Sequence, residues 1–390
     1  MLRNCIMEYK NNNKELILYF VGELNSSNAD IFEKESLDII ESQEFEKIIL
    51  DFGNLKYISS AGLRIVLKLK QRYQNVVIRE VSLEVYDILQ MTGFTNIIQC
   101  SKKLNEISID GAQVIGEGFF STVYRIDKDT IIKVFNRTSD AGQIERELKL
   151  AKTAFVLGIP TAISFDIVKV KEKLGVRFEM LDCMSLKNCF LQYPEKYAEL
   201  LKKYVELLKK INSTECLDLS IPDMHEIYKQ KVETIKPYFT NEQYKKIANL
   251  FESLQQKNTL VHGDCHFKNI MVQGEDFLLI DMDTLSRGNP IFELAQLRAP
   301  YVAFDEDDPG NSERFMGVSS DFAKKLFNDI VKMYFGGNIE KIEQKIALIC
   351  YVHMVWWTIV NTPENDKRLN GCKERLLKLL EKIDDLNIGE

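Results

Sequence analysis

Two short segments in the C-terminal half of the chain contain residue types that can hold a metal ion and move a proton. One is LVHGDCHFKNIMV (260–272) and the other is FLLIDMDT (277–284), and both combine an apolar run with polar residues. The candidate side chains are an imidazole, an amide and three carboxylates: His262, Asn269, Asp264, Asp281 and Asp283. Carboxylate and amide oxygens are ligands that Mg²⁺ prefers, so magnesium chemistry is the first candidate.

The spacing between these two segments predicts a β-hairpin. The apolar runs 270–272 and 277–280 flank a turn signal at 273–276, so they should pair as antiparallel strands. This pairing places Asn269, just before the first strand, beside Asp281, just after the second. We therefore expect Asn269 and Asp281 to hold Mg²⁺, which keeps substrate phosphates among its ligands.

Asp264 is the candidate catalytic base, because it lies five residues before Asn269 and can project from the same loop. Two of the four histidines of the chain, His262 and His266, lie in this loop as well. A zinc site is the alternative, but it needs more soft ligands than the loop contains.

A glycine-rich segment further upstream is a candidate phosphate-binding loop. GEGFFSTVYRI (116–126) has alternating flanks that predict a hairpin, with Gly116, Gly118 and Ser121 around its tip. Glycines there let backbone N–H groups approach a phosphate. The strand TIIKVF follows and carries Lys133. An ordinary hairpin turn is the alternative, because this glycine pattern alone is not specific.

The helix predicted at QIERELKLAKTAF (143–155) offers carboxylates to Lys133. Its apolar residues recur at the helical spacing and form one stripe. Glu145 and Glu147 lie on opposite sides of that stripe, so geometry allows either to reach inward to Lys133. Two solvated surface glutamates are the alternative.

The elements that position these residues fall into two regions. Residues 1–105 alternate β-like runs with amphipathic helices, which predicts a right-handed βαβ unit in a small α/β domain. Residues 106–390 begin with a strand-rich part, about 110–182, and continue as a helical part, about 183–390. We expect an α+β bilobal domain with a cleft between its lobes. The apolar stretch 346–360 should be a buried core helix.

The motifs of the second region resemble a known family. HGDCHFKN followed by LLIDMD resembles the HGDxxxxN and IDxxD signatures of the aminoglycoside phosphotransferase and choline kinase group, which has a protein-kinase-like fold. By position, the resemblance implies that Asp264 is the catalytic base and that Asn269 and Asp281 bind Mg²⁺. It also implies that Lys133 contacts the α- and β-phosphates of ATP and pairs with Glu147.

Two further segments resemble parts of the same fold. FEMLDCMSL resembles the hinge between lobes, where backbone groups from Glu179 to Leu181 would meet adenine. RGNPIFELA resembles the GDPxxDLA segment, with Asn289 in place of the first acid and Glu293 in place of the second.

The first region resembles STAS domains, the fold of anti-sigma-factor antagonists, in the segment IILDFGNLKYISSAGLRIVL. The likeness covers nearly all of 1–103 and implies phosphorylation at Ser60, with Ser59 in the usual aspartate position. Independently of the family, Ser59 or Ser60 can cap the following helix, and a helix N-terminus favours phosphate. Two interpretations of these serines therefore remain. They only cap the helix, or they belong to a partner-binding surface with or without phosphorylation.

Composition limits the partners and the location. The 390 residues include 51 Lys and Arg against 58 Asp and Glu, a net charge of −7, so nucleic-acid binding is not expected. The N-terminal residues contain no apolar signal segment, and no apolar stretch is long enough to span a bilayer. The eight cysteines are scattered without a CxxC pair. We expect a reduced cytoplasmic protein that binds no membrane.

The expected function is an ATP-dependent phosphotransferase that acts on an alcohol group of a small molecule, with a STAS module for regulation or partner binding. The acids at 305–308 either attract an amine-bearing, cationic acceptor or form a solvated loop. Met354, Trp356 and Trp357 either line the acceptor pocket or pack in the core.

Two other functions are alternatives. A non-catalytic partner-switching regulator that senses nucleotide is disfavoured by the complete motif set. A serine protein kinase is disfavoured because the sequence has HGD rather than HRD and no APE segment.

Overall fold

The computed structural model describes residues 5–118, 121–136 and 141–387. The chain divides into two compact units, Met1–Ser108 and Ile109–Glu390, where the sequence suggested 1–105 and 106–390. Each unit is described by itself.

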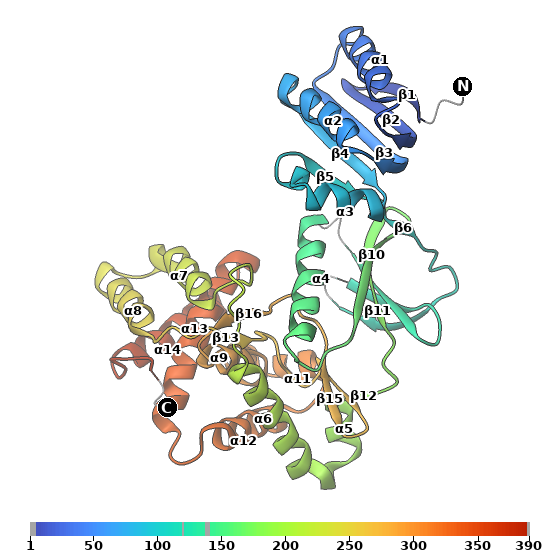
Figure 1. Ribbon diagram of the computed structural model, residues 1–390. Helices are drawn as coiled ribbons and strands as arrows, with labels where there is room; N and C mark the ends of the chain where they lie inside the picture. Colours follow the sequence, from blue (N-terminus) through green and yellow to red (C-terminus); the bar gives the residue numbers. More distant parts are fainter. Residues whose placement is uncertain (1–4, 119–120, 137–140, 388–390) are drawn as a thin grey trace. The chain divides into compact units, whose positions relative to one another are not determined.

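The N-terminal unit is the predicted small α/β domain (Figure 1). Its elements are β1 (Cys5–Asn12), β2 (Glu15–Leu24), α1 (Ala29–Glu41), β3 (Lys47–Ile58), α2 (Ser60–Arg72), β4 (Val76–Val81), α3 (Leu83–Met91), β5 (Gln99–Lys102) and the short β6 (Asn105–Glu106). The sheet order is β1-β2-β3-β4-β5, with β1 antiparallel to β2 and the remaining pairs parallel. The apolar run of β3 is buried because helices cover the sheet, as central parallel strands require.

The C-terminal unit begins with a small lobe of antiparallel strands. They are β7 (Gln113–Glu117), β8 (Ser121–Arg125), β9 (Thr130–Phe135), β10 (Ser164–Val170) and β11 (Lys173–Glu179), and they neighbour one another in the order β10-β11-β9-β8-β7. Helix α4 (Ala141–Val156) packs on this sheet through Ile144, which contacts the core formed with Phe135 and Val176. Ile144 and Leu148 therefore face the sheet as the periodicity predicts, whereas Phe155 at the end of the same stripe is half exposed.

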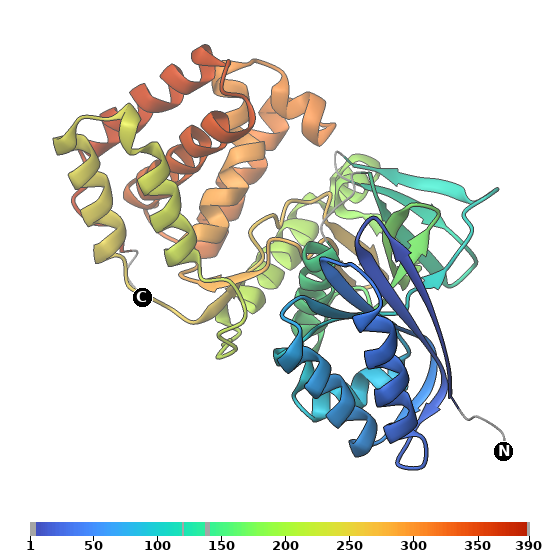
Figure 2. The same ribbon diagram turned by 90° about the horizontal axis from the view of Figure 1, so that it is seen from above.

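The second lobe is helical, and its described residues also form two short antiparallel sheets, β12-β14-β15 and β13-β16. Its elements are β12 (Met184–Ser185), α5 (Leu186–Gln192), α6 (Tyr197–Ser213), α7 (Met224–Ile235), α8 (Asn241–Ser253), β13 (Thr259–Val261), β14 (Ile270–Gln273), β15 (Asp276–Leu279), β16 (Ser286–Gly288), α9 (Ile291–Arg298), a π-helical turn (Ala299–Ala303), α10 (Phe304–Asp307), α11 (Asn311–Met316), α12 (Ser320–Phe335), α13 (Glu340–Asn361) and α14 (Asp366–Leu380). Figure 2 shows the helices from α7 onward gathered into one bundle.

Helix α13 forms the centre of this lobe. Residues 346–352 are buried without interruption, and α13 packs against α7, α9 and α14. The prediction of a core helix in this apolar stretch is confirmed. Within the described residues, no helix combines the length and the apolar character needed to cross a membrane.

Candidate active site

The β14–β15 hairpin joins the two motif segments as the sequence predicts. The strands pair in antiparallel register, from Ile270 opposite Leu279 to Gln273 opposite Asp276. Beyond the last pair, the N–H of Ile280 donates to the carbonyl oxygen of Asn269 at 3.0 Å. Asn269 and Asp281 are therefore held at the same end of one hairpin.

Lys133 connects this hairpin to the small lobe. Its Nζ lies 2.6 Å from Oε1 of Glu147 on α4 and 2.7 Å from Oδ1 of Asp281. Burial disfavours the ammonium charge, but these carboxylates outweigh it and raise the pKa of Lys133. Glu145, the other carboxylate that the sequence allowed, is exposed to solvent. The structure thus resolves the choice in favour of Glu147.

Asp281 adopts an unusual backbone conformation, with φ at 66°. A non-glycine residue in the left-handed region costs about 1–3 kcal/mol and persists where its surroundings hold it. Lys133 is part of that surrounding structure, and it keeps the pKa of Asp281 below its ordinary value although burial acts in the opposite direction. Such strain is typical of a side chain that must be aimed at a ligand.

Asp264 and Asn269 are joined by direct hydrogen bonds. Nδ2 of Asn269 donates to Oδ2 of Asp264 at 2.9 Å and to its carbonyl oxygen at 3.0 Å. Because the amide donates toward Asp264, its oxygen is left for another ligand. Burial and the neighbouring Asp281 raise the pKa of Asp264 to about 7, which is the range of a general base at neutral pH.

Glu293 holds the backbone of the HGD loop from inside the helical lobe. Its carboxylate accepts from the N–H of His262 at 2.5 Å and of Gly263 at 3.2 Å, and the side chain is fully buried. Gly263 has φ at 81°, and a Cβ there would lie 3.1 Å from the carbonyl oxygen of Thr284, so glycine is required. Asn289 instead accepts from the N–H of Ile291 at the start of α9. Glu293 is therefore a positioning residue for the loop.

Two tyrosines that sequence reasoning missed also fix the loop. The hydroxyl of Tyr204 donates to the carbonyl oxygen of Cys265 at 2.5 Å, and the hydroxyl of Tyr301 accepts from the N–H of Phe267 at 2.9 Å. Both tyrosines are fully buried, in α6 and in the π-helical turn. Nothing in the local sequence distinguishes them from core aromatics, because their partners are backbone atoms far along the chain.

The glycine-rich segment forms the predicted hairpin. Strands β7 and β8 pair around it, and the N–H of Gly118 donates to the carbonyl oxygen of Ser121 at 2.8 Å. A Cβ added at Gly116 or Gly118 would meet its nearest described atom at 3.7 or 3.5 Å. Packing among the described residues therefore does not demand glycine, which fits close approach by a ligand. The tip residues 119–120 lie outside the described residues.

The hinge segment borders a cavity of about 420 Å³, lined by Glu179, Met180 and Leu181 together with residues 158–161. The N–H of Glu179 donates to Ile163, and that of Met180 donates to Asp129. Among the described hinge residues, the N–H of Leu181 is left without a backbone acceptor. It is the group that the hinge can offer to a planar base.

The donor set of the site fits Mg²⁺. Asp281 supplies carboxylate oxygens and Asn269 an amide oxygen, which are hard ligands. Across the described parts of the chain, no group of three or more His, Cys, Asp and Glu side chains is arranged to hold a metal. A cation here would need further ligands from substrate phosphates or water, which is how Mg²⁺ is usually bound.

Comparison with known proteins agrees with this geometry. The profile of the phosphotransferase enzyme family (APH) matches residues 111–315, just over half of the chain. The chain belongs to this phosphotransferase family. Its fold class is therefore a small α/β domain followed by a kinase-like domain.

Solved structures of aminoglycoside phosphotransferases are similar at low identity. The GDP complex of aminoglycoside 2′-phosphotransferase-IIIa is 12% identical, with 76% of this chain and 97% of that one aligned at a TM-score of 0.47. The gentamicin complex of APH(2″)-IIa is 16% identical, with 76% and 96% aligned at a TM-score of 0.45. Such distant likeness leaves the acceptor open.

The N-terminal unit of this phosphotransferase is a STAS domain, matched by that family over residues 6–107. The putative anti-sigma factor antagonist BtrV of Bordetella bronchiseptica is 37% identical over 86 residues, which are 21% of this chain and 73% of the relative. The anti-sigma F factor antagonist of Paenibacillus polymyxa is 25% identical over 99 residues, which are 24% and 85% of the two chains.

In the STAS domain, the structure separates the two adjacent serines. Ser59 is the N-cap of α2, and its hydroxyl accepts from the N–H of Gly62 at 3.4 Å. Ser60 is the first residue of the helix and is exposed. The capping role that the sequence left open between them thus belongs to Ser59, and the hydroxyl of Ser60 is accessible.

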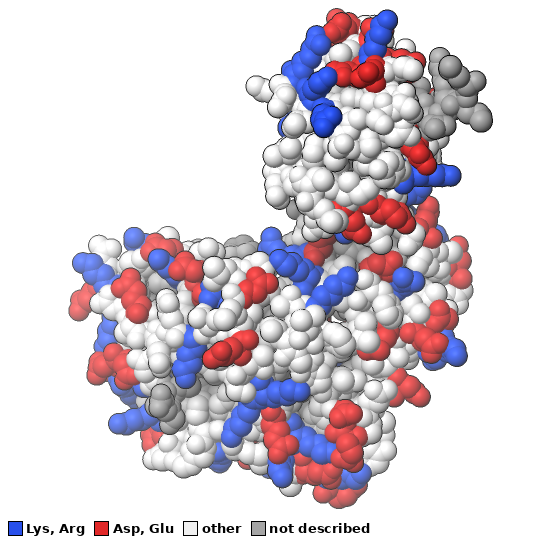
Figure 3. Space-filling view, in the orientation of Figure 1, with Lys and Arg blue, Asp and Glu red and all other residues white. Residues whose placement is uncertain are grey.

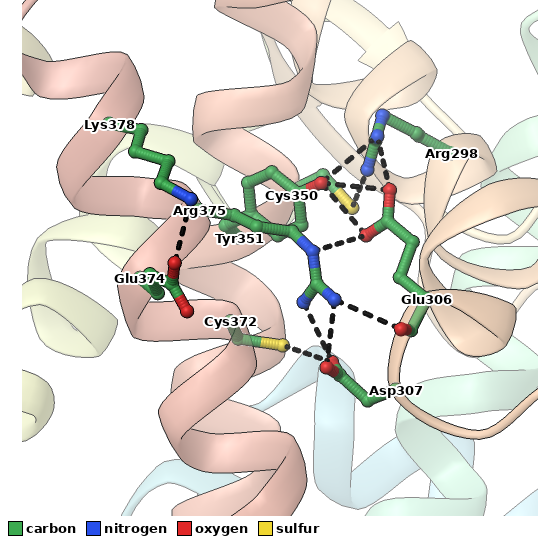
Figure 4. A network of polar contacts seen from close by, with 9 residues as sticks. All are labelled: Arg298, Glu306, Asp307, Cys350, Tyr351, Cys372, Glu374, Arg375 and Lys378. Atoms are coloured by element: carbon green, nitrogen blue, oxygen red, sulfur yellow. Dashed lines mark hydrogen bonds and ion pairs between the residues drawn. The ribbon is translucent and has the colours of Figure 1, made fainter.

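In the acidic run 305–308, arginines of the same lobe neutralise Glu306 and Asp307 (Figure 4). Glu306 pairs with Arg298 at 2.9 Å, and Asp307 pairs with Arg375 at 2.9 Å. Asp308 pairs with Arg314, while Asp305 is buried and accepts from the N–H of Ser312 at 2.7 Å. Glu306 and Asp307 are therefore neutralised by arginines and do not form an open cation site, whereas the pair of Asp308 with Arg314 is exposed.

Proposed function

We propose that the C-terminal unit transfers the γ-phosphate of ATP to a hydroxyl group of a small molecule. The observation that carries this proposal is the joining of Lys133, Glu147 and Asp281 in one ion-pair network beside the bonded pair Asp264 and Asn269. Phosphoryl transfer requires positioning and charge neutralisation more than covalent catalysis, and this arrangement offers both.

Each side chain has a role in this proposal. Lys133, fixed by Glu147, contacts the α- and β-phosphates, and Asp264 orients the acceptor hydroxyl and takes its proton. The hydroxyl oxygen bonds to the γ-phosphorus, the bond to the β-phosphate oxygen breaks, and ADP leaves. Mg²⁺, held by Asn269 and Asp281, would neutralise phosphate charge.

The nucleotide would occupy the space between the glycine-rich hairpin and the hinge. Gly116, Gly118 and Ser121 lie where backbone groups can approach phosphates, and backbone groups from Glu179 to Leu181 would meet adenine. The 420 Å³ cavity borders the hinge on the side of residues 158–161 and is lined by no described residue of the hairpin. The side chain of Glu179 accepts from the N–H of Ile163 at 2.7 Å, which fixes the hinge backbone.

The STAS domain would bind a protein partner and regulate the chain. Its exposed side chains include the apolar Tyr57, Leu83 and Met91. The face of this unit seen in Figure 3 has a broad area without charged side chains. A phosphate on Ser60 would add about −1.5 to −2 charges at the start of α2. That change would oppose burial of the surface by a partner.

We also place the protein in the cytoplasm. The seven cysteines from Cys100 to Cys372 are free thiols, which supports a reducing compartment.

The test is ADP release by the full chain with Mg·ATP, with and without a panel of hydroxylated small molecules. Acceptor-dependent release supports the phosphotransferase. Nucleotide binding without turnover would favour a nucleotide-sensing regulator, and phosphate found on Ser60 as the only product would favour a serine protein kinase.

A further inference from the structure

A second cavity is lined in part by Asp264, the proposed base. Its volume is about 100 Å³, small compared with the 300–1,000 Å³ of most ligand pockets. It is lined by Gly263, Asp264, Gln296, Ala299, Pro300, Phe304, Phe315, His353, Met354 and Trp357. Met354 and Trp357 thus line a pocket, whereas Trp356 does not.

The lining contains few polar side chains. Asp264 is the only acid among these residues, and Gln296 donates to the hydroxyl of Tyr228 at 3.0 Å. The remaining polar groups are the imidazole of His353 and the indole N–H of Trp357, which α13 places in the cavity wall. A cationic acceptor would find no carboxylate here apart from Asp264.

The imidazole of His353 contacts a buried lysine, Lys231. Nζ of Lys231 lies 2.9 Å from Nδ1 of His353, and Lys231 is only 6% exposed. When Lys231 is protonated, its ammonium group donates to Nδ1 and the ring hydrogen of His353 is on Nε2. The Nε2–H of His353 is then available as a donor, and His353 lines the cavity.

Lys231 has no carboxylate partner within the described residues. Its Nζ instead lies 4.4 Å from the ring centre of Tyr228 and 4.8 Å from that of Trp356. Burial lowers the pKa of Lys231 to about 7, because no nearby acid replaces the lost hydration. An anion in the cavity would supply the missing negative charge.

A second cationic side chain, Lys268, lies against the cavity wall, where Asp264 is the one acid among the described lining residues. Nζ of Lys268 donates to the carbonyl oxygen of Phe315 at 2.9 Å and lies 4.8 Å from the centre of its ring, and Phe315 lines the cavity. The acids that could have balanced these lysines, residues 305–308, are committed to arginines or to a backbone N–H. The electrostatic surroundings of the cavity therefore favour an anion.

We propose that the acceptor is a small hydroxylated anion, such as a hydroxy acid, whose carboxylate accepts from Nε2 of His353 while its hydroxyl group faces Asp264. This inference rests on the proposed function and names its substrate class. It replaces the amine-bearing acceptor that the acidic run suggested.

The experiment uses matched pairs that differ in one carboxylate: glycerate with glycerol, and 3-hydroxybutyrate with 1,3-butanediol. Ethanolamine and kanamycin represent cations. Binding to the full chain with Mg²⁺ and a non-hydrolysable ATP analogue is measured by ligand-observed NMR, and turnover by ADP release. We expect each acid to bind at least tenfold more tightly than its alcohol and than either amine.

Lys231→Met tests whether the charge of Lys231 causes the preference for acids over alcohols. Methionine can fill the space beside the rings of Tyr228 and Trp356 without a charge. We expect this variant to bind the acids at least tenfold more weakly while its alcohol affinity changes less than threefold. Lys229→Met is the matched control, since Lys229 is on the same helix and exposed, and it should behave as wild type. Melting temperatures verify that both variants fold.

Acids that bind no better than their alcohols, or tighter binding by ethanolamine or kanamycin, would overturn the anion proposal. Unchanged acid binding in Lys231→Met would do the same. Failure of the proposed function is distinguishable, because wild type would then release no ADP with any acid, alcohol or amine, whether or not it binds the Mg·ATP analogue.

Discussion

The HGD loop with its hairpin and the segment 305–308 both gather carboxylates in the helical lobe, but the two regions use them differently. Asp264 and Asp281 are tied to an amide and to Lys133, which can be exchanged for ligand contacts. Glu306 and Asp307 are tied to the guanidinium groups of Arg298 and Arg375, which have no other evident role. The group that neutralises a carboxylate decides whether that carboxylate can bind a ligand or move a proton. The number of acids in a segment does not.

The largest expected effect is at Asp281, the proposed metal ligand. Asp281→Asn should abolish Mg·ATP turnover while the fold is retained, because it removes a charged ligand and the partner of Lys133. Steady-state ADP release and circular dichroism measure the two effects.

The control for this variant is Asp276→Asn, which alters an exposed acid at the turn end of the same hairpin. It should keep wild-type turnover. Turnover of Asp281→Asn within about tenfold of wild type, a barrier change of about 1.4 kcal/mol, would remove Asp281 from the catalytic set.

The next effect in size is at the base. Asp264→Ala should lower kcat by about 10²-fold or more, since general-base contributions are commonly about 10²–10⁴-fold. Affinity for the nucleotide should change little. Separate determination of kcat and of the KM for ATP checks this, and an effect confined to KM would assign Asp264 to nucleotide binding.

In the acidic segment 305–308, we expect a substitution to change the free energy of unfolding and not kcat. Arg375→Met leaves Asp307 without its main partner and should cost about 1–3 kcal/mol of unfolding free energy, with kcat of the folded protein retained. Denaturant unfolding measures this cost. Lys378→Met on the same helix breaks only an exposed pair with Glu374 and should cost less than about 1 kcal/mol. A large loss of kcat in Arg375→Met would place the acidic segment in the active site.

The smallest effects concern the STAS domain. Ser59→Ala should cost about 1 kcal/mol through loss of the helix cap, whereas Ser60→Ala should be nearly neutral. Thermal unfolding distinguishes the two serines. If a partner docks at this helix start, Ser60→Glu should weaken its binding and Ser60→Ala should preserve it in pull-down experiments. Equal partner binding by both variants would reject a switch at Ser60.

Sequence reasoning succeeded where a contact is local or periodic. The β14–β15 hairpin needs only two apolar runs and a turn, so the approach of Asn269 to Asp281 could be predicted from spacing. The sheet of the STAS domain and the burial of α13 likewise follow from apolar patterning.

The remaining features depend on contacts between distant segments. Arg375 lies on α14, 68 residues from Asp307 along the chain, so its neutralising effect has no local signal. Helical geometry alone could not choose between Glu145 and Glu147, because the choice depends on where Lys133 lies. The same holds for Lys231, which looks like a surface lysine of α7 until α13 covers it.

The most direct test of the central claim follows the γ-phosphate itself. The full chain is incubated with Mg·ATP and a mixture of small hydroxylated acids, alcohols and amines, and the products are resolved by ³¹P NMR. We predict a new phosphomonoester resonance that depends on the acceptor mixture and is lost in Asp264→Ala. ATP that stays intact, or that yields only inorganic phosphate or phosphoserine on the protein, would contradict small-molecule phosphoryl transfer.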